Sequence, residues 1–243
     1  MPSTKSNAII DAKNDNKSPS RVERRKLATR AKLLEAAYKV MSTKGIDAAT
    51  LQEITDEADV GFGTVYNYFS GKEELAEQVL DCVIDDFGRR NDAATAKLRE
   101  EYPAAASPAS MRLVLREAMV DPMWRWWLKR PELLADRMTL CFRPFGLRDI
   151  KLSVENNSYS LIGDDLEKTW ATIMWIYVGG LRDLVLGSSS YEHKNQIIEA
   201  ILRVLGVPLE ECNVIVNMPL PEYGKADINF NFSLEKSQLE SPE

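Results

Sequence analysis

One stretch of the sequence limits the fold more than any other: a helical pattern that is interrupted after about two turns and lies between two helix starts. Thr50 with Glu53, and Ser70 with Glu73, have the spacing of a capping box, in which a side-chain oxygen caps the first turn of a helix. Apolar residues follow helical spacing on both sides of an interruption at residues 59–61. The stretch therefore predicts a short helix, a tight turn, a second short helix over residues 62–69 and then a longer helix.

A long helix is also predicted before this stretch. Five residues recur there at alternating spacings of four and three, as one face of a helix requires: Leu27, Ala31, Leu34, Tyr38 and Met41. Gly45 follows as a residue that readily adopts the left-handed conformation of a helix C-cap. The longer helix after the stretch is predicted by four apolar residues at steps of four: Leu75, Val79, Val83 and Phe87.

The remainder of the chain is predicted to be helical as well. Helical patterns cover residues 111–120, 123–129, 131–142, 164–186 and 192–205, with a break at 102–110 and an irregular stretch at 144–163. Residues 227–234 alternate weakly, as a strand would. The expected fold is all-α, with four regions: a disordered basic arm (1–23), a helix-turn-helix domain (24–90, motif at about 50–69), a second helical domain (91–216) and a poorly ordered acidic tail (217–243).

Charge is distributed unevenly along the chain. The net charge is −6 over 243 residues, yet residues 17–32 hold seven basic side chains and one acidic. From residue 207 onward there are seven acidic side chains and two lysines. A short basic block on an acidic body suits a local contact with a polyanion, because salt screens such attraction beyond about 10 Å. A solvated arm is the alternative.

The cysteines and the absence of long apolar runs bear on the compartment. Cys82, Cys141 and Cys212 are widely spaced and odd in number, which argues against a disulfide framework. No run approaches the roughly 18–20 apolar residues of a membrane-spanning helix. The polar residues 1–20 lack the apolar stretch of a secretory signal. We therefore expect a cytoplasmic protein without membrane contact.

Two short helices joined by a tight turn have the geometry that fits a DNA major groove. Val60 precedes the second of them, Gly-Thr-Val-Tyr follows at residues 63–66, Tyr-Phe at 68–69 and Lys-Glu-x-Leu at 72–75. With these motifs the segment resembles the TetR family of bacterial regulators, closely over residues 24–85, about a quarter of the chain. The resemblance implies a three-helix, N-terminal helix-turn-helix DNA-binding domain and a C-terminal helical domain for ligand binding and dimerisation.

Two residues depart from the pattern of the family. Asp59 stands where the family commonly has Gly, and Gly61 stands where it has Ser or Thr. Asp tolerates the left-handed conformation of the turn, and Gly can cap a helix. The turn is therefore expected to be kept, without the phosphate contact of a Ser hydroxyl.

Residue types on the outer face of the motif predict its contacts with DNA. Hydroxyl and amide side chains bond base edges or phosphates, glycines let the backbone approach the duplex, and an apolar ring packs on a thymine methyl. The predicted contacts are Thr50, Gln52, Gly61, Phe62, Gly63, Thr64, Tyr66, Asn67, Tyr68 and Lys72, with Arg24 and Arg25 from the basic block. Val65 and Phe69 are predicted to face the core. For the three outward aromatic residues, packing within the domain is the alternative.

The second helical domain is predicted to hold an apolar ligand cavity between its helices. All five tryptophans lie in this region. The predicted lining residues are Met123, Trp127, Met138, Phe142, Arg143, Trp170, Met174 and Tyr177. Arg143 would bind an anionic head-group. Plain core packing is the alternative for the apolar residues.

A last pattern suits the pairing of two subunits. Apolar residues of the late helices recur at spacings of four and three, and a glycine among them permits close approach. In the resembled family the last two long helices form a four-helix dimer interface. This implies an interface role for Leu166, Ile173, Gly180, Leu184, Ile197, Ile201 and Leu205. Burial within one chain is the alternative.

Together these patterns predict a homodimeric transcription regulator that binds a near-palindromic, double-stranded DNA operator and responds to a small-molecule effector. The resemblance implies repression as the default. No Walker loop, nucleophile elbow or metal motif is present, and His193 is the single histidine, so we expect no enzyme, no cofactor and no metal. Two other classes stay open: a helical interaction protein of the same fold without DNA binding, and a helical enzyme that transforms a small molecule.

Overall fold

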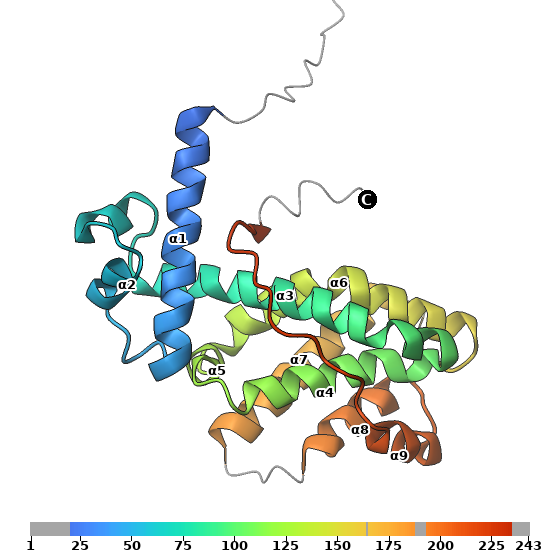
Figure 1. Cartoon of the computed structure of the whole chain (residues 1–243). Coiled ribbons are helices and arrows are strands. Elements are labelled where there is room, and N and C mark those ends of the chain that lie inside the picture. Colours follow the sequence, from blue (N-terminus) through green and yellow to red (C-terminus); the bar gives the residue numbers. More distant parts are fainter. Residues whose placement is uncertain (1–19, 164, 188–192, 235–243) are drawn as a thin grey trace, which may run out of the picture.

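The computed structural model describes residues 20–163, 165–187 and 193–234, and these residues form helices and no strand (Figure 1). In chain order the helices are α1 (Arg21–Lys44), α2 (Leu51–Glu57), η1 (Phe62–Asn67), α3 (Lys72–Glu101), η2 (Pro103–Ala105), α4 (Ala106–Ala118), α5 (Met123–Trp127), α6 (Pro131–Glu155), α7 (Leu166–Leu186), α8 (Lys194–Val204) and α9 (Leu209–Asn217), where η denotes a 3-10 helix. None of the described helices is long and apolar enough to cross a membrane. The all-α fold class is confirmed.

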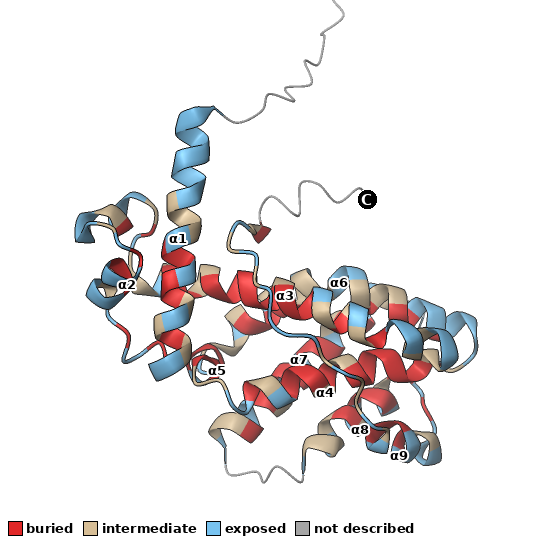
Figure 2. Ribbon diagram, in the orientation of Figure 1, coloured by how far each residue is buried: buried red, intermediate tan, exposed pale blue. Residues whose placement is uncertain are grey.

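α1 begins at an earlier residue than the sequence predicted. Its apolar face becomes buried only after the first turns. Ser20 and Glu23 form a capping box at its first turn, so the predicted disordered arm over residues 1–23 extends too far. Residues 1–19 of that arm lie outside the described residues. Leu34 and Met41 are buried, but Leu27 is exposed because the first turns of α1 extend beyond the helices that α1 packs against (Figure 2).

α3 is one uninterrupted helix of 30 residues that joins the two halves of the molecule. Its start packs against α1, and it also packs against α4 and α6. Buried residues of both halves form one continuous hydrophobic core. The domain boundary expected between residues 90 and 91 falls inside α3, so the two halves share a structural element.

The start of α3 lacks the capping box predicted at Ser70 and Glu73. Gly71 is the N-cap, and no side chain caps this helix. The backbone N–H of Ser70 instead donates to the Glu74 carboxylate (2.6 Å). This hydrogen bond lowers the pKa of Glu74.

α6 corrects the prediction for residues 131–163. The pattern predicted a helix to residue 142 and an irregular stretch from 144, whereas α6 continues to Glu155. Pro144 lies inside the helix on its exposed side, where water can satisfy the carbonyl that loses its hydrogen bond. The break predicted at residues 102–110 is also shorter, since η2 leads directly into α4.

Three tryptophans anchor α5 against its surroundings. Trp124, Trp126 and Trp127 are all buried. The rings of Trp124 and Trp127 meet edge to face with centroids 5.6 Å apart. The indole N–H of Trp127 donates to the carbonyl of Ala76 in α3 (3.4 Å). The segment is therefore enclosed by protein on both sides.

Residues 218–234 correct the prediction of a poorly ordered tail from residue 217. They leave α9 as an extended segment that crosses α4 and α3 and reaches the side of α1 (Figure 1). Four of them are partly buried against the core: Tyr223, Ile228, Phe230 and Phe232. Leu234 is buried. Residues 235–243 lie outside the described residues.

Candidate nucleic-acid interface and ligand pocket

The predicted capping box closes the N-terminus of α2. The backbone N–H of Glu53 donates to Thr50 Oγ1 (3.3 Å), and the backbone N–H of Thr50 donates to the Glu53 carboxylate (3.0 Å). Hydrogen bonds from Lys44 and Thr50 lower the pKa of Glu53 to about 2. Thr50 and Gln52 are exposed, but the Thr50 hydroxyl donates to Glu53 (2.8 Å) and the Gln52 amide donates to Asp56 (2.7 Å). Both predicted DNA contacts are therefore already oriented by neighbours in the motif.

A single left-handed residue makes the turn between α2 and η1. Asp59 has a φ of 49°, which Asp tolerates better than most side chains do. The N–H of Val60 donates to the carbonyl of Thr55 (3.0 Å) and closes the turn. Gly61 is then the N-cap of η1 without a side-chain hydrogen bond. The turn is kept in spite of the departure at residue 59.

The second helix of the motif is the 3-10 helix η1 and ends at Asn67, whereas a regular helix was predicted over residues 62–69. Val65 and Phe69 are buried, as predicted. Gly63 lowers helix propensity by about 1 kcal/mol relative to Ala. Tighter 3-10 geometry is common in such short segments.

Two aromatic side chains lie exposed on the outer face of η1. Phe62 is 45% exposed and Tyr66 is 54% exposed, and their rings meet edge to face with centroids 5.9 Å apart. Asn67 is also exposed, whereas Thr64 is half-buried. Tyr68 is half-buried and packs against the core. Packing within the domain, the alternative for the aromatic residues, therefore describes Tyr68 better than Phe62 or Tyr66.

Gly61 and Gly63 leave the backbone open on this face. A Cβ at Gly63 would have no heavy atom within 4 Å, and a Cβ at Gly61 would meet only Thr64 Oγ1 at 3.7 Å. Packing within the chain therefore requires neither glycine. The space beside them is available to a molecule that approaches from outside.

Lys72 holds the motif together at the start of α3. Its ammonium donates to the carbonyls of Asp47 (3.0 Å) and Ala49 (2.9 Å). Because an ammonium has three donors, at most one is left for a phosphate. These bonds fix the loop before α2 against α3, a positioning role that the sequence did not reveal.

The basic block of α1 divides into an exposed part and a packed part. Arg24, Arg25 and Lys26 are exposed on the first turns, at the same end of the molecule as η1 (Figure 1). Arg30 is half-buried, and its guanidinium donates to the side-chain oxygen of Gln78 in α3. Arg30 thus helps to hold α1 against α3.

A partly enclosed pocket lies among α3, α4, α6 and α7, with about 480 Å³ of non-atom space that includes the open solvent at its mouth. Four of the eight predicted pocket residues line it: Phe142, Trp170, Met174 and Tyr177. The structure places the others elsewhere, with Met123, Trp127 and Met138 fully buried in the core and Arg143 exposed and ion-paired with Glu167. Met123, Trp127 and Met138 therefore pack in the core instead of lining the cavity. Arg143 forms a surface ion pair instead of binding a head-group in the cavity.

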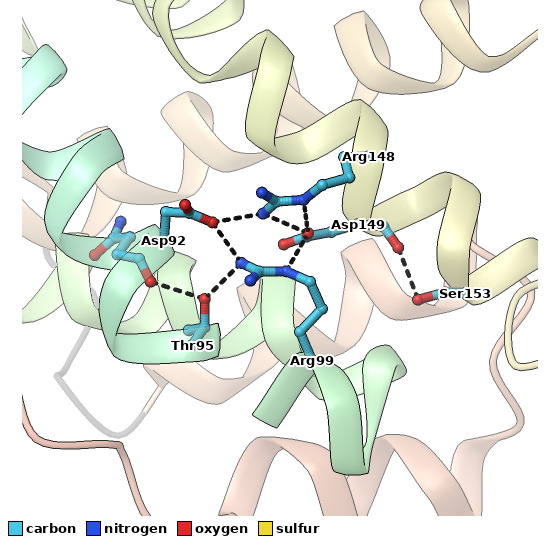
Figure 3. A network of polar contacts seen from close by, with 7 residues as sticks. Asp92, Thr95, Arg99, Arg148, Asp149 and Ser153 are labelled. Carbon is cyan, nitrogen blue, oxygen red and sulfur yellow. Dashed lines mark hydrogen bonds and ion pairs between the residues drawn. The ribbon is translucent and has the colours of Figure 1, made fainter. Parts of the chain in front are cut away.

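Two arginines and two aspartates form an ionic network beside the cavity (Figure 3). Arg99 donates to Asp149 (2.7 Å) and to Asp92 (2.8 Å). Arg148 donates to the same two carboxylates (2.9 and 2.6 Å), and the Asp149 side chain is only 5% exposed. The four charges balance, so the network adds no net charge to the cavity wall.

One polar atom of the wall is left without a bond. The amide of Asn91 donates to the carbonyl of Ser110 (3.4 Å), but its buried Oδ1 has no hydrogen-bond partner among the described residues. The hydroxyl of Tyr177 and the indole N–H of Trp170 are bonded to backbone carbonyls. Asn91 Oδ1 is therefore an acceptor that suits a donor on an occupant.

The sequence patterns above did not predict the polar wall, although one spacing in α3 points to it. Gly88, Asp92, Thr95 and Arg99 recur at spacings of four, three and four, which places them on one face of α3. Gly88, Asp92 and Arg99 line the cavity, and Arg99 also donates to Thr95 (3.1 Å). On a helix whose other faces carry buried apolar residues, such a polar stripe indicates a polar wall inside the fold.

The predicted subunit interface is largely buried within one chain. Four of its residues are buried in the core: Ile173, Leu184, Ile201 and Leu205. Leu166 and Ile197 are half-buried and pack against that core. A Cβ at Gly180 would lie 2.7 Å from the side chain of Ile197, so this glycine lets α7 approach α8. For the four buried residues the spacing thus reflects packing inside the subunit, and they are corrected to core positions, while an interface role for the half-buried residues stays a prediction.

α7 has a second, exposed face with the same periodicity. Five exposed residues recur there at spacings of four and three: Lys168, Thr172, Trp175, Gly179 and Arg182. Trp175 is 50% exposed, although tryptophan is usually covered. A Cβ at Gly179 would have nothing within 4 Å. This face, rather than the predicted one, is open to a partner.

Comparisons with known proteins agree with this architecture. A family model described as "Bacterial regulatory proteins, tetR family" matches residues 33–79, which contain the helix-turn-helix motif. The HTH-type transcriptional regulator YfiR of Bacillus subtilis is 31% identical over 104 residues, which are 43% of this chain and 49% of that protein. The HTH-type transcriptional repressor NicS of Pseudomonas putida is 31% identical over 106 residues, which are 44% of this chain and 45% of that protein. The matched part thus spans less than half of each of these relatives.

Similarity to a solved structure extends over both halves of the molecule. The crystal structure of RolR in complex with the ligand resorcinol superimposes with a TM-score of 0.74 and 26% sequence identity, covering 84% of this chain and 100% of that chain. Together with the matched family model and the related HTH-type regulators, this shared fold shows that residues 33–79 form a helix-turn-helix domain of the type found in the TetR family of bacterial regulatory proteins, whose members are transcription regulators.

Proposed function

We propose that this regulator is a homodimeric repressor that binds a near-palindromic DNA operator in the cytoplasm and is released by a small-molecule effector. The exposed ring pair of Phe62 and Tyr66, beside the open backbone of Gly63, carries the DNA-binding part of the proposal. The exposed basic turns of α1 lie at the same end and supply attraction for phosphates. In a two-fold dimer, two η1 helices enter successive major grooves about 34–36 Å apart.

Direct base contacts are assigned to the open part of this surface. Thr64, Tyr66 and Asn67 supply hydroxyl and amide groups at the level of the base edges, while Arg24 and Arg25 meet the backbone. Seven further predicted contacts complete the surface: Thr50, Gln52, Gly61, Phe62, Gly63, Tyr68 and Lys72. The side chains of Thr50, Gln52 and Lys72 are hydrogen-bonded to neighbouring residues. Their proposed role is therefore to position the motif against the phosphates.

Selection of bound sequences from random DNA duplexes tests this assignment. We expect a two-fold symmetric site, and an affinity that falls by several powers of ten between low and moderate salt if about 6–10 phosphates are contacted. A selected pool without symmetry would contradict a dimeric repressor. Binding to DNA that is absent at all salt concentrations would favour the helical interaction protein of the same fold.

The partner subunit is assigned to the exposed face of α7. Trp175 offers a large apolar side chain, and Gly179 one turn along lets a second helix approach closely. Trp175→Arg is expected to shift the protein from dimer to monomer in sedimentation velocity, with its helical circular dichroism unchanged. A variant that remains dimeric would remove this face from the interface.

The effector is assigned to the class of small, neutral, hydroxylated aromatic compounds. The cavity has aromatic walls in Phe142 and Trp170, a balanced ionic network, and an unbonded acceptor in Asn91. A charged ligand would upset the balance of that network, whereas a phenolic hydroxyl can donate to Asn91 Oδ1. The related structure of RolR was solved with resorcinol, a compound of this class.

Binding of resorcinol as a probe tests this class through the fluorescence of Trp170 in the cavity wall. We expect saturable quenching by resorcinol that is weaker for benzoate, which carries a charge. The matched variant Trp170→Phe should bind without the fluorescence change. Tighter binding of benzoate than of resorcinol would overturn the assignment.

In the proposed mechanism the effector prefers a conformation with the wrong operator spacing, so it releases DNA by shifting populations.

A further inference from the structure

The segment formed by residues 218–234, called the C-terminal strap below, is fastened first to α4. Arg112 of α4 donates to the carbonyl of Met218 (2.8 Å). The ring of Tyr223 then lies under the guanidinium groups of Arg90 and Arg116, at 4.4 and 5.6 Å from the ring centroid. Such cation–π contacts hold the strap against two helices at once.

The middle of the strap is bonded to α3. Arg90 donates to the carbonyl of Gly224 (3.2 Å), and Arg89 donates to the carbonyl of Asp227 (3.1 Å). The backbone N–H of Asp227 donates to Asp86 Oδ1 (3.0 Å), while Arg90 donates to Asp86 Oδ2 (2.6 Å). The Asp86 side chain is only 1% exposed, so the strap supplies one of the partners that a buried carboxylate requires.

The last part of the strap reaches the DNA-binding half. The ring of Phe230 lies 5.8 Å from the ring of Tyr38 in α1. Leu234 is buried, and together with Ser233 it lines a small hollow beside Arg30 of α1 and Gln78 of α3. Burial of the Tyr38 hydroxyl raises its pKa. The strap therefore connects α4, α3 and α1 in a second path, outside the direct contacts of α1 with α3.

The strap and the ligand cavity share the same helices. On α3, Asp86 and Arg90 face the strap, whereas Asn91 and Asp92 line the cavity. On α4, Arg112 and Arg116 hold the strap while neighbouring residues line the cavity. An extended segment has no helical hydrogen bonds of its own and loses about 1–2 kcal/mol of backbone entropy per ordered residue, so it keeps its place only through such contacts.

We propose that the C-terminal strap is a positioning element for DNA binding: it fixes α1, and with it the helix-turn-helix motif, in one orientation on the cavity helices. The DNA readout below depends on the proposed function, but the restraint on α1 does not. Because the strap contacts both the cavity helices and α1, movement of α3 or α4 on effector binding is transmitted to α1 through it.

Substitution of Phe230, the strap residue whose ring meets α1, tests the proposal. In the full-length protein, Phe230→Ala is expected to increase hydrogen exchange of backbone amides in α1 while exchange in α6 and α7 stays as in the wild type. Operator affinity is expected to fall about 5- to 10-fold, with an unchanged slope of affinity against salt because no phosphate contact is lost. Phe230→Leu keeps most of the apolar contact. It should therefore restore most of the protection of α1 from exchange and most of the operator affinity.

Tyr223→Phe is the matched control. The buried Tyr223 hydroxyl has no hydrogen-bond partner among the described residues, so this variant keeps the ring and its arginine contacts and should behave as the wild type. Wild-type exchange of α1 in Phe230→Ala would overturn the proposal, and a reduced salt slope would show that the strap contacts DNA instead. If the wild type binds no DNA, the proposed function fails, and the exchange of α1 still decides the role of the strap.

Discussion

On the outer face of η1, Phe62 and Tyr66 are exposed and contact one another, whereas beside the cavity the buried Asp149 is bonded to the half-buried Arg99. The first pair offers its surface to an external molecule and contributes little to folding. The second pair is part of the folded structure before any ligand arrives. Under the proposed function, replacing a residue of the exposed pair therefore weakens DNA binding alone, while replacing a residue of the cavity network also lowers the stability of the protein.

Asp149→Leu is expected to have the largest effect, on the stability of the protein. It leaves Arg99 and Arg148 with Asp92 as their remaining carboxylate in the network, and stranding a largely buried charge is strongly destabilising. We expect the free energy of unfolding in urea to fall by about 2 kcal/mol. The control Lys97→Met removes an exposed ion pair and should change it by less than about 0.5 kcal/mol. Equal losses in the two variants would contradict the structural role of the network.

Tyr66→Ala is expected to weaken DNA binding without destabilising the protein. Because the side chain is exposed, the free energy of unfolding should stay within about 0.5 kcal/mol of the wild type. Operator affinity measured by fluorescence anisotropy should fall about tenfold, which corresponds to about 1.4 kcal/mol. Destabilisation without loss of affinity would place Tyr66 in the fold rather than at the DNA.

A smaller effect is expected from Thr64→Ala, which sharpens the assignment within η1. Loss of a hydroxyl that reads a base edge should relax the preference at one position of each half-site by a few-fold. Thr64→Ser retains the hydroxyl and should keep the selected sequence. If repeated selection with Thr64→Ala returned the same site with the same strength, Thr64 would not read bases.

The smallest effect concerns the pH dependence of the capping box in α2. The pKa of Glu53 is lowered from its ordinary value of 4.5 to about 2, so its contribution to stability is fully present above pH 4.5 and is lost as the pH falls toward 2. Glu53→Gln should lack this part of the dependence. Thermal unfolding at pH 6 and pH 3 should therefore differ less in the variant than in the wild type, and parallel losses would exclude the carboxylate as the cause.

Most features set by near neighbours in the sequence were predictable, although the capping box predicted at Ser70 and Glu73 is absent. The capping box of Thr50 and Glu53, the left-handed turn at Asp59 and the buried Val65 each depend on residues within a few positions, and all three are present. The cavity network was not predictable in this way. Arg99 and Asp149 are 50 residues apart, and their pairing depends on α6 continuing through Pro144.

Periodicity alone also cannot identify the partner of an apolar face. The pattern around Gly180 correctly indicated close helix packing, but the same spacing serves a helix of the same chain and a helix of another subunit. The strap is a further case, since the hydrogen bond of Arg89 with Asp227 joins residues 138 positions apart. The weak alternation at residues 227–234 marks the apolar side chains that pack against the core, but it does not reveal which helices they contact.

Because α3 runs unbroken from the helix-turn-helix motif to the cavity, it acts as a lever. Gly88 in the cavity wall is 16 residues from Lys72 at its first turn, a distance of about 24 Å along a helix that rises 1.5 Å per residue. A tilt of about 5° at the cavity would carry the first turn through about 2 Å at that radius. Under the proposed function, a very small rearrangement around an effector would therefore be enough to shift η1 of each subunit out of register with the DNA groove.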